Sequence, residues 1–203
     1  NYLELSPLFL EGAMLFYLGQ VFAAWAYSHF LEYFVHRFVL HNRKASKFWF
    51  NYHFAEHHFA ARRVHMIDKK NFGSLKSLLT DYEVWGLLFL GLLHFPLWFI
   101  APAAYYTLLA CGVSYYMVHR VCHIDHEKAR EMYPWHYDHH MGPNQNVNWG
   151  IRLPVVDHLF NTRVKWKGNK KEITQHVLGK NGLRDYVQAR SRRIECKEPK
   201  ESS

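Results

Sequence analysis

The sequence predicts an all-α protein, a bundle of helices embedded in a membrane, with a histidine-rich site on the cytosolic side. Two long uncharged segments predict the helices, and four clusters of histidine predict the site. The chain has 203 residues, of which 49% are hydrophobic and 17% aromatic, and it contains 16 histidines. This length allows one domain of ordinary size with a substantial core.

The first uncharged segment, residues 12–31, contains no Asp, Glu, Lys or Arg. A helix of this length spans about 30 Å, which is the thickness of the hydrocarbon core of a bilayer. Gly, Gln and Ser dilute its apolar character. We therefore predict a helix over 12–31 that lies in the membrane.

The second uncharged segment runs from Val84 to Val118. A single helix over this segment would be about 52 Å long, which is too long for one crossing. Pro96 and Pro102 lie near its middle, and proline interrupts helices. The pattern predicts two short helices that form an in-and-out hairpin. A buried hairpin in a soluble protein is the alternative, although such helices usually have a polar face.

Basic residues are in excess between the two segments. From Arg37 to Lys76 there are nine Lys and Arg residues against Glu56 and Asp68, and the chain beyond the hairpin is also rich in Lys and Arg. Positively charged loops face the cytoplasm, so both polar parts are expected on that side. The net charge of +8 comes without a basic helix, an RNA-binding motif or a zinc finger, so we expect no nucleic-acid partner.

We expect two parts in the chain: a membrane-embedded domain over 1–165, and a polar C-terminal extension over 166–203 that ends in a disordered tail. Residues 143–154 are rich in Asn, Gly and Pro and predict a loop. Three cysteines without a CxxC pair argue against a disulfide framework and fit a reducing compartment. The chain opens with Asn1 and no signal-peptide pattern, so we expect it to be part of a longer protein.

Four clusters contain the candidate metal ligands, which are His36, His41, His53, His57, His58, His119, His123, His136, His139 and His140. On a regular helix, residues four apart differ by about 40°, so His53 and His57 share a face and His58 lies at its edge. His36 and His41 would differ by about 140°. We therefore expect His41 just beyond the end of the first helix.

Converging neutral imidazoles bind transition metals, and iron, zinc, copper and manganese are the candidates. Ten ligands exceed the four of a closed tetrahedral zinc site, so two metals that share them are the simplest interpretation. Nearby polar groups are expected to orient the ligand rings. The candidates for this role are Glu32, Glu56, Asp125, His126 and Asp138, of which His126 is also a reserve ligand.

The chain resembles the fatty acid hydroxylase superfamily, integral-membrane diiron enzymes that include lipid hydroxylases, sterol oxidases, desaturases and aldehyde-forming wax enzymes. The strings HRFVLH, HFAEHH, HRVCH and HYDHH carry the resemblance and contain all ten histidines. Downstream, Asn148, Pro154, Asp157 and FNT at 160–162 resemble the family ending N…P…D…(F/Y)GT. The resemblance covers roughly residues 25–165 and adds Asn148 and Asp157 to the candidates that orient the ligands.

Several positions depart from the family pattern. His53 and His57 are separated by three residues, where fatty-acid 2-hydroxylases typically have two. The wax and aldehyde branch resembles this chain in the longer spacing. The HxxxH of HRVCH differs from the HxxxxH of carotenoid hydroxylases. Asn161 replaces the usual Gly, and His158 stands where Arg or Lys is common. These departures leave the substrate branch open.

The resemblance implies two iron ions and O2, which oxidise an unactivated C–H bond of a fatty acyl, sphingolipid or sterol-like lipid. Hydroxylation is the expected outcome, with desaturation or aldehyde formation as the alternative. Zinc can replace iron on purification, because it binds such ligands more tightly. Electrons would come from an external donor such as cytochrome b5 or a ferredoxin. The membrane would be the endoplasmic reticulum in a eukaryote or the inner membrane in a bacterium.

Two other functions stay open on the residues alone. Residues 53–57 read HxxEH, the inverted zinc-protease signature, in which Glu56 would be the base. A protease would leave the other three clusters unused. A metal transporter or storage protein would place its ligands along helices near the bilayer midplane, whereas these clusters lie at or beyond the predicted helix ends.

Overall fold

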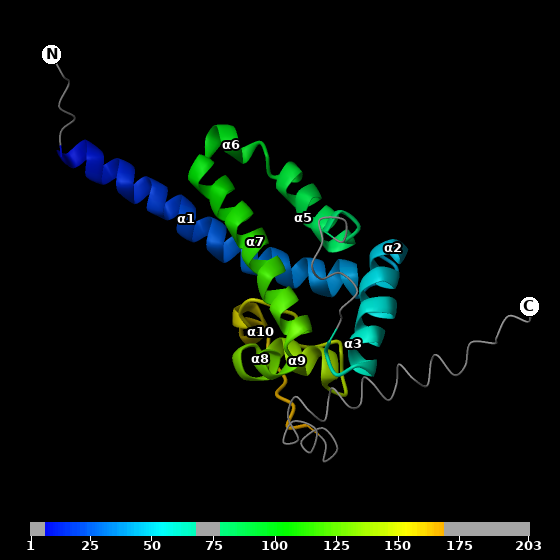
Figure 1. Cartoon of the computed structure of the whole chain (residues 1–203). Coiled ribbons are helices and arrows are strands. Elements are labelled where there is room, and N and C mark those ends of the chain that lie inside the picture. The colour runs from blue at the N-terminus through cyan, green and yellow to red at the C-terminus, as the bar shows by residue number, and fades with distance from the viewer. Residues whose placement is uncertain (1–6, 68–77, 169–203) are drawn as a thin grey trace, which may run out of the picture. The chain divides into compact units, whose positions relative to one another are not determined.

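The computed structural model describes residues 7–67 and 78–168 (Figure 1). The chain divides into two compact units, Asn1–Lys165 and Trp166–Ser203. The first unit holds all ten candidate ligands. The predicted C-terminal extension and its tail lie almost wholly outside the described residues.

Every regular element within the described residues is a helix, which confirms the predicted all-α class. The elements are α1 (Pro7–Val35), η1 (His36–Leu40), α2 (Lys47–Phe50), η2 (Asn51–His58), α3 (Phe59–Arg63), α5 (Tyr82–Leu93), α6 (Leu97–Ile100), α7 (Pro102–Ile124), α8 (His126–Met132), α9 (Pro134–Met141) and α10 (Val155–Leu159). Two of them, η1 and η2, are π-helices, whose backbone bonds join residues five apart instead of four.

The long helices α1 and α7 pack against each other and form the frame of the first unit. Figure 1 shows α7 crossing α1, with α5 and α6 near the N-terminal half of α7 and α8, α9 and α10 gathered near its C-terminal end. Helix α10 also packs on α1, and α3 packs on α9. The chain segments that contain the histidine clusters are thereby brought together at one end of the frame.

The two prolines separate α5 from α7, as the sequence predicts. Helix α5 ends at Leu93, a turn follows, and α6 has only four residues. Helix α7 begins with Pro102 at its first position, where the missing N–H breaks no helical bond. At the other end of the hairpin, Asp81 caps α5 by accepting a hydrogen bond from the Glu83 backbone N–H at 2.9 Å.

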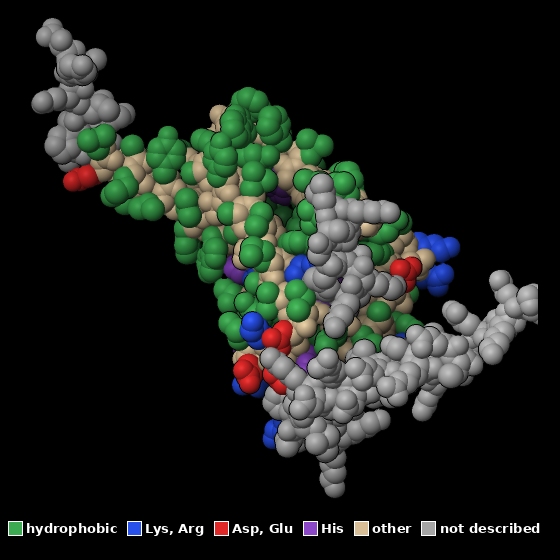
Figure 2. Space-filling model, in the orientation of Figure 1, with side chains coloured by type: hydrophobic (Ala, Val, Ile, Leu, Met, Phe, Trp, Pro, Cys, Tyr) green, Lys and Arg blue, Asp and Glu red, His purple; other side chains and the backbone are tan. Residues whose placement is uncertain are grey.

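In the described parts of the chain, no helix combines the length and the apolar character that a bilayer crossing needs. Large apolar side chains are nevertheless exposed along α1, α5, α6 and α7; Leu92, Phe99 and Ile100 are more than 70% exposed. Figure 2 shows this apolar surface over the side of the unit that contains α1 and α6. The charged side chains in the same view lie mostly toward the other end of the unit.

Candidate metal centre

Nine of the ten candidate ligands form two groups, and within each group one nitrogen of every ring lies within 4.8 Å of the others. The first group is His36, His41, His53, His58 and His139. The second group is His57, His119, His123 and His140. All of these rings except His41 and His57 are buried. Each group is a candidate position for one metal ion.

The π-helices η1 and η2 decide which histidines share a group. The His41 backbone N–H donates to His36 O at 3.1 Å, and this five-residue bond brings both rings into the first group. In η2 the Nε2 atoms of His53 and His58 are 3.2 Å apart. The rings of His53 and His57 lie with their centroids 5.4 Å apart, yet the two residues belong to different groups. His58, which a regular helix would place only at the edge of this face, is the residue of η2 that shares a group with His53.

Two pairs of consecutive histidines join the groups. His57 and His58 end η2, and His139 and His140 lie in α9, yet each pair gives one ring to each group. The rings of His58 and His140 are stacked with their centroids 4.1 Å apart. The two candidate positions are therefore neighbours, as in sites where two metals act together.

His136 is the predicted ligand that belongs to neither group. Its ring is fully buried, and its Nε2 lies 3.3 Å from Nε2 of His123. Its Nδ1 is buried without a hydrogen-bond partner. His136 therefore stands beside the second position, where it can serve as a fifth nitrogen donor.

Hydrogen bonds at Nδ1 fix the tautomers in the second group. His123 Nδ1 lies 2.7 Å from Met66 O, and His119 Nδ1 lies 2.6 Å from a carboxylate oxygen of Glu83. Because these oxygens only accept, both Nδ1 atoms carry the hydrogen. In the neutral rings both Nε2 atoms then present lone pairs, and they lie 3.1 Å apart. Two lone pairs at this distance repel unless a cation lies between them.

The first group is built in the same way from neutral backbone acceptors. His36 donates from Nδ1 to Trp149 O at 2.7 Å, and His139 donates to Val147 O at 2.7 Å. Their Nε2 atoms face other rings of the group at 2.9 Å and 3.1 Å. Around a metal with bonds of about 2.0–2.1 Å, nitrogens at right angles are about 2.9 Å apart and tetrahedral ones about 3.3 Å apart. The spacing and the five donors favour a coordination number above four.

Burial keeps the candidate ligands neutral. It lowers the pKa of His36 to about 3 and that of His41 to about 2, and neighbouring histidines add to the effect. Burial also lowers the pKa values of the other buried rings well below their ordinary value, namely His53, His58, His123, His136, His139 and His140. Neutral rings at pH 7 leave their lone pairs available for a metal.

Acidification is therefore expected to destabilise the metal-free protein. Between pH 6.5 and about pH 3 the unfolded chain binds a proton that folded His36 does not, so the free energy of unfolding falls as the pH falls. At pH 5 this ring alone accounts for about 2 kcal/mol, or a decrease in Tm of roughly 4–8 °C. Thermal unfolding of chelator-treated protein at pH 7 and pH 5 measures the effect, and an unchanged Tm would contradict it.

Two predicted carboxylates orient the ligands indirectly, by binding the backbone of residues 149–152. Asp157 is fully buried and accepts from the backbone N–H groups of Trp149 and Gly150 at 2.8 and 2.7 Å. A side chain at Gly150 would bring its Cβ to 2.4 Å from Leu153 O, so the loop fits closely at this point. Asp157 thereby fixes the carbonyl of Trp149, which holds His36.

Glu32 acts on the same loop from α1. Its carboxylate accepts from the backbone N–H of Ile151, from that of Arg152 at 3.0 Å and from Arg152 Nε at 2.7 Å. Asn148 and Asp138 bind the segment that follows α10: Asn148 bonds to Val164, and Asp138 pairs with Arg163 at 2.8 Å. We call residues 147–152, whose Val147 and Trp149 carbonyls hold His139 and His36, the ligand-orienting loop.

The other residues that are predicted to orient the ligands lie outside the two histidine groups. Asp125 caps α8 by accepting from Lys128 N–H at 3.2 Å, and His126 begins that helix outside both histidine groups. Glu56 is exposed. His53 and His57 belong to different groups, so the HxxEH string does not assemble into a single zinc-protease site.

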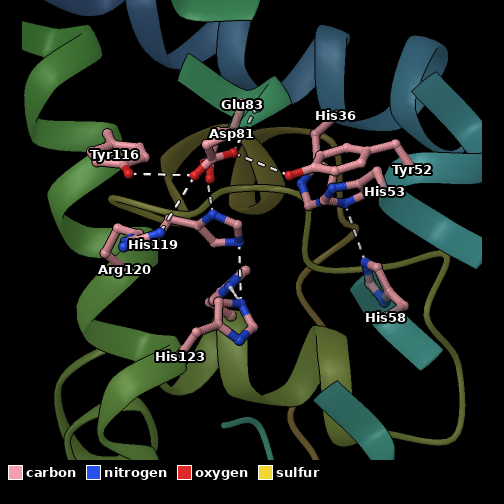
Figure 3. A network of polar contacts seen from close by, with 11 residues as sticks. His36, Tyr52, His53, His58, Asp81, Glu83, Tyr116, His119, Arg120 and His123 are labelled. Carbon is pink, nitrogen blue, oxygen red and sulfur yellow. Dashed lines mark hydrogen bonds and ion pairs between the residues drawn. The ribbon is translucent and has the colours of Figure 1, made fainter. Parts of the chain in front are cut away.

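Sequence reasoning missed the network around Asp81 and Glu83 (Figure 3). Burial by itself would raise the pKa of Glu83, but its pKa is lowered overall by His119, which bonds to the carboxylate. The available signal was the position of Asp81, an N-cap residue directly before an apolar run. Gln145 was also missed; its side-chain amide lies 2.8 Å from His58 Nδ1.

Comparison with models of known families, with curated proteins and with solved structures found no match to the chain. The two histidine groups and their surroundings indicate what the chain can bind. These groups are able to hold two metal ions as neighbours in a buried site.

Proposed function

We propose that the protein is an O2-dependent two-iron enzyme that hydroxylates a C–H bond of a lipid. The observation that carries this proposal is the pair of adjoining histidine groups, in a unit whose helices expose large apolar side chains. The resemblance of the four histidine strings and of the FNT ending to the fatty acid hydroxylase superfamily points to the same reaction.

The residues present fit metal ions. Both ring nitrogens of His140 are buried without a hydrogen-bond partner, and buried polar atoms rarely remain unpaired. A cation at the second position would satisfy one of them. The residues that would hold the two ions are His36, His41, His53, His58 and His139 at the first position and His57, His119, His123 and His140 at the second, with His136 beside them.

The donor set favours iron over a closed structural zinc site. A structural zinc takes four tetrahedral ligands, whereas the first group alone offers five nitrogens. Imidazole suits iron, copper and zinc alike, and zinc binds more tightly than ferrous iron. The metal bound after purification in air therefore does not identify the working metal, and the protein has to be reconstituted with Fe(II) before its activity is measured.

Bound iron would supply the redox chemistry, in which O2, two electrons, two protons and a C–H bond give an alcohol and water. Four ligand rings are held in one tautomer because their Nδ1 atoms donate to acceptors of the chain. These acceptors are the carbonyls of Trp149, Val147 and Met66 and the carboxylate of Glu83. Burial of the rings excludes water from the site, which protects an oxidant from side reactions.

The lipid assignment rests on the exposed apolar surface of α1, α5, α6 and α7. Apolar patches of this kind mark sites that contact a membrane or a partner. We propose that this surface contacts the acyl region of a membrane and that the substrate reaches the site from there. Exposed basic residues, such as Arg43 and Lys44 between η1 and α2 and Arg62 in α3, would dock an acidic electron donor such as cytochrome b5 or a ferredoxin on the cytosolic side.

The test is a comparison of lipid extracts by mass spectrometry. Cells that produce the protein together with an electron donor are compared with cells that produce the double variant His57→Ala/His139→Ala. We expect a lipid with one added oxygen atom only with the unaltered protein. A lipid that has lost two hydrogens would instead indicate a desaturase. If Fe(II)-loaded protein with donor and O2 changes no lipid, the proposed function is wrong.

A further inference from the structure

The ligand rings of the two positions differ in the acceptor that holds their Nδ1 atoms. His36, His123 and His139 donate from Nδ1 to neutral backbone carbonyls. His119 instead donates to the carboxylate of Glu83 at 2.6 Å. Of the Nδ1 contacts seen for these four rings, this is the one with an ionisable acceptor. A carboxylate makes a stronger hydrogen bond than a carbonyl and makes the ring a better metal donor.

The place of Glu83 is fixed independently of His119. Glu83 is in the first turn of α5, where the helix dipole favours a negative charge. The start of α5 is held by Asp81, which is 2% exposed and accepts from the Glu83 backbone N–H at 2.9 Å. Tyr52 from η2 and Tyr116 from α7 donate to Asp81 at 3.1 and 3.3 Å. Figure 3 shows these contacts converging on Asp81 beside the Glu83–His119 pair.

We infer that Glu83 is a positioning residue that acts through His119 to strengthen the second metal position and to make it chemically different from the first. The inference rests on the proposed function only in that the two histidine groups bind metal ions. The charge on Glu83 gives His119 more electron density to donate, so the ion at the second position is held more tightly by this ring than by one bonded to a carbonyl.

The test is Glu83→Gln, which keeps the size of the side chain and an oxygen that accepts from Nδ1 but removes the charge. Co(II) binding to the purified metal-free protein is titrated against a chelator. We expect two equivalents, of which one binds 10–100-fold more weakly than in the unaltered protein and the other is unchanged. The matched control is Glu131→Gln, an exposed glutamate of α8, in which both affinities should stay the same.

A second comparison separates this role from a purely structural one. In the background His119→Ala, Glu83→Gln should change Co(II) affinity less than about twofold, because the ring through which it acts is gone. Additive losses in the double variant would overturn the inference. So would equal weakening of both equivalents, or no weakening of either, in Glu83→Gln alone.

Should Glu83→Gln fail to fold, Glu83→Asp tests the same point, since it keeps the charge and withdraws the carboxylate from His119. The same selective weakening is expected, and unchanged binding of both equivalents would overturn the inference. Two bound equivalents without any lipid oxidation would contradict the proposed function and leave the role of Glu83 standing. Fewer than two equivalents in the unaltered protein would overturn both.

Discussion

Replacing His139 with alanine is expected to remove metal from the first position and to abolish lipid oxidation. His139 is fully buried, and its Nε2 lies 3.1 Å from Nε2 of His58 in the centre of the first group. Alanine deletes a direct ligand, and loss of a group that merely orients a ligand already costs 10–100-fold in metal affinity. We therefore expect a loss on the order of 100-fold or more in the affinity of one Co(II) equivalent.

His57→Ala is the matching change at the second position and should weaken the other equivalent. Either change alone should stop product formation, because the proposed oxidation uses both metal positions. The control is His158→Ala, which removes an exposed imidazole from α10 and should leave metal content and product unchanged. A double variant His57→Ala/His139→Ala that retained full activity would refute the assignment of these groups as ligands.

The local features of the chain could be predicted from sequence. An uncharged stretch and two prolines suffice to predict the helices on either side of Pro96 and Pro102, because these features act within one or two helical turns. The four histidine strings likewise identify the residues of the site. Their division between two groups could not be predicted, because it depends on η1 and η2, which join His36 to His41 and His53 to His58.

Contacts between distant parts of the chain explain the other differences. Glu32 lies next to the first cluster in sequence, but its partner Ile151 is 119 residues away and no pattern near Glu32 indicates it. Glu83 is 36 residues from His119 and belongs to no histidine string. The sequence therefore points to carboxylates that are close to the histidine clusters along the chain. Glu83, which bonds to the ligand ring of His119, instead comes from the start of α5.

The residues of the family-like ending, Asn148, Asp157 and Thr162, hold the ligand-orienting loop in place. Asn148 and Asp157 tie this loop to the segment around Thr162, whose hydroxyl donates to Asp157 at 2.7 Å. Asn161 has a φ of 54°, in the left-handed region that glycine adopts freely and asparagine tolerates better than most residues. Asn161 can therefore adopt the backbone conformation that the usual Gly would have at this position.

Asp157→Asn is expected to be the most damaging change outside the ligands. The carboxylate is fully buried and accepts three hydrogen bonds, from Trp149 N, Gly150 N and Thr162 Oγ1. The amide of asparagine would turn an NH2 toward one of these donors and leave it unsatisfied. The expected loss is about 3 kcal/mol of unfolding free energy, or roughly 6–12 °C in Tm.

The same change should also weaken one metal equivalent, because the Trp149 carbonyl that holds His36 belongs to the loop that Asp157 secures. Calorimetric unfolding and Co(II) titration measure the two effects. The control, Asp125→Asn, alters another carboxylate that accepts a backbone N–H, at the start of α8, and should cost little stability with both equivalents retained, because asparagine caps helices about as well as aspartate. If Asp157→Asn lowered stability and left both metal affinities unchanged, the loop would support the fold without orienting His36.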